Sequence, residues 1–421
     1  MLLIIFARLN GGLTMNIREL RNMFPALSRT VYGKQLVYFD NAATAQRSQS
    51  VIDKWTQLTI GANANIHRAV YKLAVDATDE YESTRDAVKE YINAAAREEI
   101  VFTSGTTGSI NLVAFSFGET FINEGDEIIV SEAEHHSDIV PWQMLCQRKG
   151  AVLRVLHVDE DGHLNLEELK SLLNPKTRIV AVTQISNVLG ILNPVKEIVS
   201  VCHSIGCPVL IDGAQGMVHE GVDVQDVDCD FYAFSGHKLY AATGTGVLYG
   251  KRKWLDQMVP YQGGGEMIAT VRFSGTTYAP LPEKFEAGTQ NINAIPTLEP
   301  TIEMLKLMKD KELLNAQEAV SQYLFHALTS NPRIRLYGVP RGTETKIPLF
   351  SFSVEGAHHE DLALILDKMG IAVRSGQMCA EPLMDRFGVT GMLRASLAPY
   401  NTMDEAEYFI KSLDKAIAML V

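Results

Sequence analysis

The chain has 421 residues, of which 46% are hydrophobic and 21% charged, and its formal net charge is −12. Nucleic acids and anionic membrane surfaces bind basic proteins, so an acidic chain is a poor candidate for either partner. The length allows two to three domains and a large buried core.

Five cysteines are present, a sparse and odd number that does not suit a disulfide framework. They favour a reducing compartment, and we expect a cytoplasmic protein. Cys202 and Cys207 lack the second pair or the histidines that a zinc site needs, so no metal is expected. The apolar start is interrupted by Arg8 and Asn10 and is too short to span a bilayer. We expect residues 1–14 to be a non-native or disordered extension and Met15 to be the native start.

Helical and strand-like segments alternate from about residue 75. Helices are predicted at 76–94, 109–117, 164–173 and 195–206, and strands at 98–105, 126–132, 151–158, 177–186, 207–215 and 230–238. This alternation predicts a mostly parallel sheet covered on both faces. A long helical stretch at 295–330 then leads into a region with fewer strands. We therefore expect an α/β protein with a large domain at 30–295, and a smaller α+β domain formed by 15–29 and 296–421.

The first candidate ligand site follows the strand at 98–105, because ligands of open α/β sheets bind at the carboxyl ends of the strands. The run from Thr103 to Gly108 includes Thr106 and Thr107 at the start of a helix. Backbone N–H groups at a helix start can cradle a phosphate. No Gly-Lys-Ser/Thr follows, so this is not a P-loop, and taken alone the run is more often an ordinary capped helix than a phosphate site.

Two ionisable residues follow the last two strands of this series. Asp212 ends a buried strand, where a carboxylate needs a partner such as a pyridinium nitrogen or the next helix. Lys238 follows another strand and can form a Schiff base with an aldehyde cofactor, although a lone lysine is usually a surface residue. Ser235 and His237 beside it suit a phosphate. The three motifs together, in one α/β run, predict a site for pyridoxal 5'-phosphate (PLP).

These motifs resemble a known family. The segments 212–215 (DGAQ) and 235–240 (SGHKLY) are similar to the cofactor motifs of the class V aminotransferases, which are PLP enzymes of fold type I. The cysteine desulfurase branch, in its SUF type, is resembled by further segments: 134–136 (EHH), 141–142 (PW), 186–190 (SNVLG), 263–265 (GGG), 285–289 (FEAGT), 374–380 (RSGQMCA) and 393–396 (LRAS). The likeness runs from about Phe24 to the C-terminus.

The resemblance implies a role for each matching residue. Lys238 forms the Schiff base, Asp212 pairs with the pyridine nitrogen, Gln215 bonds the ring hydroxyl, and His135 stacks on the ring and shuttles protons. The phosphate is held by Thr106, Thr107, Ser235 and His237, with Thr289 reaching over from a partner subunit. Substrate is bound by Asn187, Arg374 and Arg394, with Asn41, Ala42 and His67 nearby.

The same resemblance implies that Cys379 accepts sulfur from L-cysteine as a persulfide and releases L-alanine. A SUF-system acceptor protein then receives the sulfur for iron–sulfur cluster assembly, and the enzyme is a homodimer. Three positions depart from the family pattern: Met378 replaces a common His, Gly108 a frequent Glu, and Ala241-Ala242 the usual Gly-Pro. The alternatives are a selenocysteine lyase, a cysteine-sulfinate lyase and, in a different class, a non-catalytic nucleotide-binding α/β protein.

Overall fold

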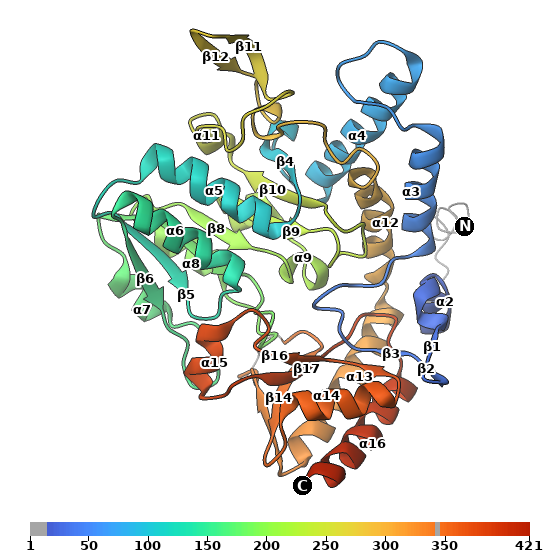
Figure 1. Ribbon diagram of the computed structural model, residues 1–421. Helices are drawn as coiled ribbons and strands as arrows, with labels where there is room; N and C mark the ends of the chain where they lie inside the picture. Colours follow the sequence, from blue (N-terminus) through green and yellow to red (C-terminus); the bar gives the residue numbers. More distant parts are fainter. Residues whose placement is uncertain (1–14, 342–345) are drawn as a thin grey trace.

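A seven-stranded sheet occupies the centre of the molecule in the computed structural model, which describes residues 15–341 and 346–421 (Figure 1). The expected extension at 1–14 lies outside the described residues. Neighbouring strands follow the order β4 (Ile100–Thr103), β10 (Gly246–Gly250), β9 (Phe231–Ser235), β8 (Val209–Asp212), β7 (Thr177–Thr183), β5 (Glu127–Ser131) and β6 (Val152–Leu156). Only β10 runs antiparallel to its neighbours, β4 and β9, so the sheet is mostly parallel as the sequence predicts.

Successive residues of these strands belong to two different hydrophobic clusters. In β9, Tyr232 and Phe234 pack on one face of the sheet and Phe231 and Ala233 on the other. Side chains alternate along a strand, so a sheet covered on both faces needs apolar residues at every position. This need explains why the strands read as unbroken apolar runs in the sequence.

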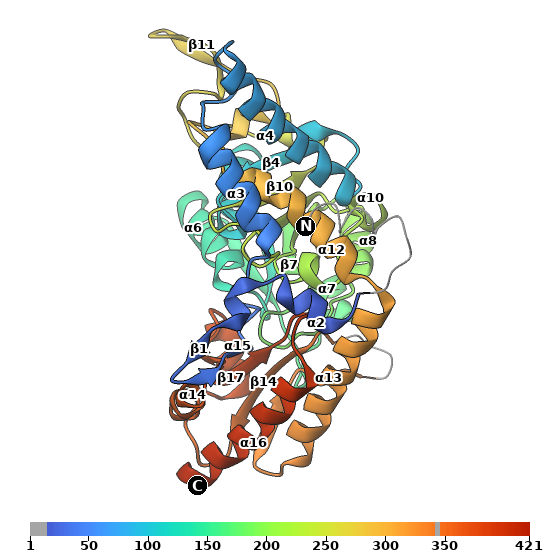
Figure 2. The ribbon, with the colours of Figure 1, turned by 90° about the vertical axis from the view of Figure 1, so that its right-hand side faces the viewer.

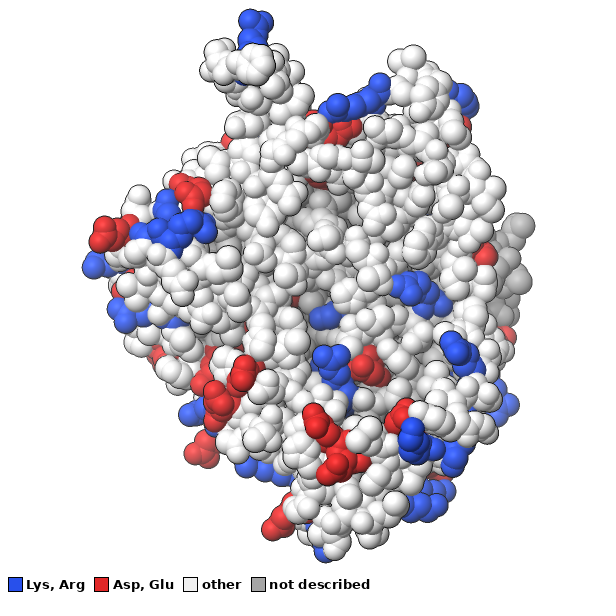
Figure 3. Space-filling model, viewed as in Figure 1, with Lys and Arg blue, Asp and Glu red and all other residues white. Residues whose placement is uncertain are grey.

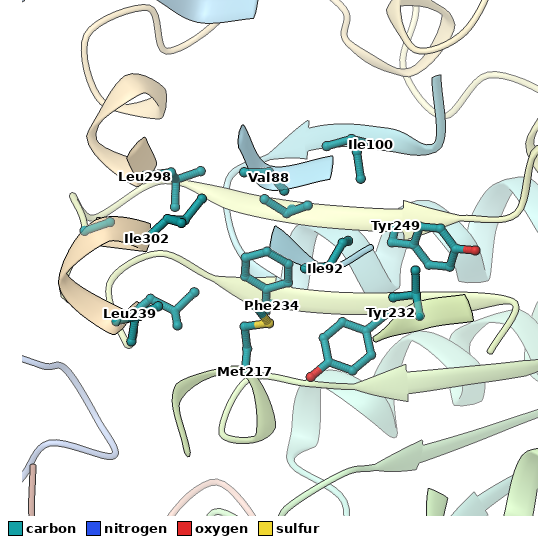
Figure 4. Close-up of a cluster of buried hydrophobic side chains, with 14 of the residues drawn as sticks. Val88, Ile92, Ile100, Met217, Tyr232, Phe234, Leu239, Tyr249, Leu298 and Ile302 are labelled. Carbon is teal, nitrogen blue, oxygen red and sulfur yellow. The ribbon is translucent and has the colours of Figure 1, made fainter. Parts of the chain in front are cut away.

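Helices cover both faces of the large sheet. One face packs against α4 (Lys72–Tyr91), α8 (Val195–His203) and α12 (Leu298–Met308), and Figure 4 shows Val88, Ile92, Leu298 and Ile302 over the sheet side chains Tyr232 and Phe234. The other face packs against α5 (Thr106–Phe121), α6 (Val140–Lys149) and α11 (Arg252–Leu255). Further helices are α3 (Gln49–Gly61), α7 (Leu166–Leu172), α9 (Gly216–His219) and α10 (Val224–Val227).

A second, four-stranded antiparallel sheet lies below the first in Figure 1. Its order is β13 (Ile334–Tyr337), β14 (Leu349–Val354), β17 (Met392–Ser396) and β16 (Arg374–Gly376). Two long helices, α13 (Lys311–Ser330) and α16 (Met403–Leu420), run beside each other along this sheet (Figure 2). The remaining elements here are α14 (His359–Lys368), α15 (Glu381–Phe387) and β15 (Ile371–Ala372).

The N-terminal segment contributes to both hydrophobic cores. Leu20 in α2 (Ile17–Asn22) and Phe24 are buried in the core of the large sheet, whereas Val37 and Phe39 are buried in the core of the small one. The second contact arises because β3 (Val37–Tyr38) pairs with β15. The sequence expectation assigned residues 15–29 to the smaller domain and the start of 30–295 to the larger one. In the structure the first segment packs in the core of the large sheet, and Val37 and Phe39 pack in the core of the small sheet. The two-domain division stays a proposal, with this segment at its seam.

The fold class expected from the sequence is confirmed. Each predicted strand is present and shorter than its pattern, and the helix predicted at 76–94 is α4, which begins four residues earlier at Lys72. Two hairpins were not anticipated: β1 (Thr30–Val31) with β2 (Lys34–Gln35), and β11 (Ile268–Arg272) with β12 (Gly275–Tyr278). Within the described part of the chain, no helix combines the length and the apolar character that a membrane crossing requires.

Candidate active site

A cavity of about 190 Å³ lies where the carboxyl ends of the large sheet's parallel strands face the small sheet. Most of the predicted site residues line it together: Ala42, Thr106, Thr107, His135, Asn187, Asp212, Ser235, His237, Lys238, Arg374, Cys379 and Arg394. They come from segments spread over more than 350 residues of chain. Such convergence at strand ends is the usual place for a ligand in an open α/β sheet.

One end of the cavity is built to take an anion. The 16-residue helix α5 begins here, and Gly105 before it has φ +148°, a conformation that side chains disfavour. A Cβ added at Gly246 in β10 would lie 2.3 Å from the Gly105 Cα, so the backbone before α5 can approach β10 only because residue 246 is glycine. The Thr106 N–H donates to Ser235 Oγ at 2.7 Å, which ties the helix start to the end of β9. The positive end of the helix dipole favours a phosphate in this position.

Asp212 and Lys238 provide the opposite charges of the site. Asp212 is 4% exposed, and its Oδ1 accepts from the Ala214 N–H at 2.8 Å. Burial raises the pKa of Asp212, and the nearby Lys238 ammonium partly offsets this rise. Burial lowers the pKa of Lys238, and Asp212 partly offsets that fall. A lysine with a lowered pKa supplies neutral amine more readily, which both Schiff-base formation and proton transfer require.

His135 is held in one orientation and stays uncharged. The Ser137 N–H donates to its Nδ1 at 3.1 Å, so the neutral ring carries its proton on Nε2. Burial, followed by the Lys238 charge, lowers the pKa of His135 to about 3. Burial also lowers the pKa of His237 to about 4. Both imidazoles are therefore neutral near pH 7 and can stack or donate without adding charge.

Arg394 is a buried cation with one nitrogen that has no hydrogen-bond partner. Its Nη1 donates to Asn187 O at 2.8 Å and its Nη2 to Asp40 Oδ1 at 3.1 Å, while its Nε is buried without a partner. Burial lowers the pKa of Arg394, and Asp40 partly offsets this fall. A guanidinium held in this way fits a carboxylate that enters the cavity.

Cys379 lies on a short loop that crosses from the small sheet to the large one. Met378 and Cys379 have φ of +56° and +55°, unusual values for residues other than glycine. The His136 N–H donates to Cys379 O at 2.7 Å, and His136 Nε2 accepts from the Glu381 N–H at 3.0 Å. His136, in the turn that follows β5 of the large sheet, therefore bonds to the backbone of the cysteine loop at both Cys379 and Glu381.

Cys379 differs from the other cysteines in its exposure. It is exposed, whereas Cys202, Cys207 and Cys229 are buried and Cys146 is partly buried. Burial raises the pKa of Cys202 to about 12, which leaves almost no thiolate at neutral pH. Met378, the departure from the family pattern, is 4% exposed and packs among Ala133, Leu383 and other apolar residues. It fills space under the loop and offers no proton-transfer group there.

Four residues predicted at or near the site lie outside this cavity. Gln215 is buried beside it and donates from Nε2 to Ala42 O at 2.8 Å, and Asn41 donates to Ser396 O at 2.8 Å. His67 has its Nε2 3.1 Å from Glu82 Oε1. Thr289 lines a separate cavity of about 280 Å³. A single chain does not bring Thr289 and His67 to the cavity, and Thr289 was expected to act from a partner subunit.

Sequence reasoning missed Asp40, His136 and Ser137 as contributors to the site. Asp40 pairs with Arg394 across 354 positions of chain, a contact that no local pattern reveals. His136 lies within the quoted motif 134–136, so its presence was noted without its role. Ser137 follows His135 closely enough for a short-range hydrogen bond to have been anticipated.

Comparison with known proteins agrees with this geometry. The sequence profile described as Aminotransferase class-V matches residues 37–409. The chain belongs to the class-V aminotransferase family. Two similar members are cysteine desulfurases: that of Pectobacterium carotovorum subsp. carotovorum (strain PC1) is 44% identical over 96% of this chain and 98% of its own length, and that of Escherichia coli O8 (strain IAI1) is 44% identical over 97% and 100%.

Solved structures of the class-V family superpose closely on this chain. The cysteine desulfurase CsdA (S-sulfonic acid) from Escherichia coli has a TM-score of 0.89 and 39% identity, covering 97% of this chain and 100% of its own. The apo cysteine desulfurase from Thermococcus onnurineus NA1 has a TM-score of 0.90 and 34% identity, with the same coverage. These likenesses confirm the resemblance inferred from the motifs and the fold-type-I architecture.

Proposed function

We propose that this chain is a PLP-dependent cysteine desulfurase that converts L-cysteine to L-alanine and keeps the sulfur as a persulfide on Cys379. The observation that carries the proposal is that an exposed thiol and a largely enclosed lysine of lowered pKa line one cavity. A non-catalytic nucleotide-binding protein would need neither group.

The cavity fits PLP by its charges and its shape. Asp212 would face the pyridine nitrogen, and His135 would stack on the ring. Gln215, the residue after Ala214 in the cavity wall, would reach the ring hydroxyl. Lys238 would hold the aldehyde carbon covalently. The phosphate would lie at the start of α5, and its side-chain partners would be Thr106, Thr107, Ser235 and His237. When bound, PLP withdraws electrons from the substrate's α-carbon.

Substrate binding and proton transfer follow from the chain's own residues. The guanidinium of Arg394 and the side chain of Asn187 would bind the substrate carboxylate, and Arg374 would add positive field at the exposed side. The substrate's amine would first displace Lys238 from the aldehyde carbon and take its place there. The grip on the carboxylate would then place the α-proton near Lys238, whose freed neutral amine would remove it. Ala42 at the cavity wall would limit the space beside the substrate.

Cys379 would complete the reaction by attacking the substrate's sulfur atom as a thiolate. A sulfur–sulfur bond forms, the substrate's carbon–sulfur bond breaks, and its electron pair goes to the carbon, which is protonated and leaves as L-alanine. The balance is one cysteine and one enzyme thiol giving one alanine and one enzyme persulfide. The loop geometry supports this step because His136 holds the Cys379 backbone while its side chain stays exposed.

We further propose a homodimer in which Thr289 completes the partner's phosphate site. Large apolar side chains are exposed on the 70–75 segment and on the β11–β12 hairpin, among them Val70, Tyr71, Val271 and Phe273. The centre of the face in Figure 3 carries few charged side chains, whereas acidic and basic residues are mixed over the lower part. A cytoplasmic location, consistent with five unpaired cysteines, and a SUF-type acceptor protein that takes the persulfide complete the proposal.

The test follows visible absorbance and sulfide release from L-cysteine with a reductant present, for wild type and Cys379→Ala. We expect a Lys238-dependent band in both proteins and sulfide release in wild type alone, with Cys146→Ala as the matched control that keeps activity. A band without dependence on Cys379 would overturn the persulfide step. Parallel assays with L-selenocysteine and cysteine sulfinate decide between the proposal and the two lyase alternatives.

A further inference from the structure

Two carboxyl groups lie buried behind the cavity, and the mechanism above uses neither. Glu134 precedes His135, and Asp138 ends the short turn η3 (His136–Asp138) that follows it. Both are 0% exposed. The two side chains point into the protein from the same turn, within hydrogen-bonding reach of each other.

Each carboxyl group has one oxygen satisfied and one left over. Glu134 Oε1 accepts from Ser131 Oγ and from the Thr183 N–H, the latter at 2.9 Å. Asp138 Oδ1 accepts from Trp142 Nε1 at 2.8 Å. Glu134 Oε2 and Asp138 Oδ2 are both buried without a hydrogen-bond partner. Two orphaned acceptors of this kind are costly unless a donor joins them.

The surrounding charges favour a proton as that donor. Asp212 at the end of β8 adds a third negative charge next to the pair, and Lys238 faces Asp212. Helices α5 and α6, which also pack on the turn, carry Glu119 paired with Arg148 at their far ends. Burial raises the pKa of Glu134 to about 8 and that of Asp138 well above its usual range. Among the described residues, no group of three or more His, Cys, Asp or Glu side chains could hold a metal ion.

We propose that Glu134 and Asp138 share a single proton and act as a positioning pair for the cofactor site. The shared proton closes the turn around His135, because it joins residues 134 and 138 on either side. It also limits the charge behind Asp212 to one negative unit, so that Asp212 can itself remain ionised toward a pyridine nitrogen. The pair touches neither substrate nor cofactor.

Infrared spectroscopy of the purified holoenzyme at pH 7 tests the proton directly. We expect a carboxylic-acid C=O band that shifts in D₂O and is lost in Asp138→Asn, whose new amide nitrogen would donate to Glu134 Oε2 in place of the proton. Asp230→Asn is the matched control: Asp230 is 0% exposed but fully hydrogen-bonded by Trp254, His203 and the Val209 N–H, and its pKa is lowered. That change should leave the band in place.

Stability as a function of pH gives an independent readout. The pair's folded pKa is raised, so the stability that the proton contributes is full at acidic pH and is lost as pH rises through about 8. Asp138→Asn has no such proton to lose. The wild-type denaturation midpoint should therefore fall relative to that of Asp138→Asn between pH 6 and pH 9.

A double-mutant cycle separates sharing from simple repulsion. Glu134→Gln and Asp138→Asn should each be tolerated, because one amide donates to one remaining carboxylate. The double variant would place two NH₂ groups face to face, and its midpoint should fall by more than the sum of the single changes. A double variant more stable than either single one, or no difference in the carboxylic-acid band, would overturn the proposal. None of these readouts depends on the substrate, so the proposed function can fail without affecting them.

Discussion

The two sides of the cavity differ in how far their functional side chains are buried. On the side of the large sheet, Asp212 is buried, Lys238 and His135 are mostly enclosed, and burial displaces all three pKa values. On the side of the small sheet, Cys379 and Arg374 are exposed, and the cysteine loop is held by backbone hydrogen bonds to His136.

This difference separates two chemical tasks. Electron withdrawal and proton transfer gain from a dry, preorganised site, where electrostatic interactions are strong. In the proposed reaction the persulfide passes to another protein, so the residue that carries it would have to reach solvent. Arg394 is the exception on the small-sheet side, since it is 3% exposed and faces inward. In the proposed reaction, the buried half of the cavity would bind and activate the substrate, and the exposed half would collect the sulfur.

The largest effect should come from the buried half. Lys238→Ala removes the cavity-lining amine that would hold the cofactor and move the α-proton. We expect the visible band to disappear and sulfide release to fall by at least about 10³-fold, or about 4 kcal/mol. Circular dichroism should show an intact fold. Sulfide release within about tenfold of wild type would contradict the assigned role of Lys238.

Arg394 and Arg374 both line the cavity, but Arg394 is buried and Arg374 is exposed. The same Arg→Lys change at each position therefore tests how burial affects its cost. Arg394→Lys keeps the charge but loses the planar fork, and we expect kcat/KM for L-cysteine to fall about 10- to 100-fold, mainly through KM. Arg374→Lys should change kcat/KM by less than about tenfold, because the lysine keeps the positive charge and the position is exposed, where a guanidinium contact contributes little. Steady-state kinetics measures both variants. Equal losses in kcat/KM would show that burial does not determine how much each arginine contributes.

A smaller effect should follow from loosening the exposed half. His136→Ala removes the acceptor of the Glu381 N–H, a hydrogen bond worth about 1 kcal/mol. We expect sulfide release to slow by about fivefold while the visible band keeps its position. His136→Gln, whose amide oxygen can accept the same bond, should recover part of the rate. A shifted band in His136→Ala would mean that the residue acts on the buried half instead.

The smallest effect concerns pH. The folded pKa of His135 is lowered to about 3, below the unfolded value of about 6.5. The unfolded state therefore binds more protons between these values, and His135 makes folding less favourable as pH falls from about 6.5. Chemical denaturation at pH 7.5 and pH 5 should show a smaller loss of stability in His135→Asn than in wild type. An equal loss in both proteins would mean that His135 is not held neutral.

The buried half was the more predictable one from sequence. Asp212 and Lys238 follow strands whose apolar runs are unmistakable, and the carboxyl ends of parallel strands meet at one edge of a sheet. Thr106 could be placed because a helix pattern follows it directly. Placing a ligand site at the carboxyl ends of parallel strands requires only local patterns and the parallel topology, and the sequence displays both.

The exposed half depended on contacts between distant segments. Arg394 meets Asp40 and Cys379 meets His136 only after the small sheet has packed below the large one. The strand β10 escaped notice because it is antiparallel and follows β9 without an intervening helix. The left-handed φ of Met378 and Cys379 also had no sequence signal, since neither residue is a glycine. Family resemblance, rather than any local pattern, identified Cys379.

The most direct test of the proposed function is the mass of Cys379 after a single turnover. The enzyme is mixed with one equivalent of L-cysteine without reductant, quenched, alkylated, digested and analysed by mass spectrometry, with alanine quantified in the same sample. We predict that the peptide containing Cys379 gains one sulfur atom in proportion to the alanine formed, while the peptides containing Cys146, Cys202, Cys207 and Cys229 do not. Alanine formed without added sulfur on Cys379 would contradict the account.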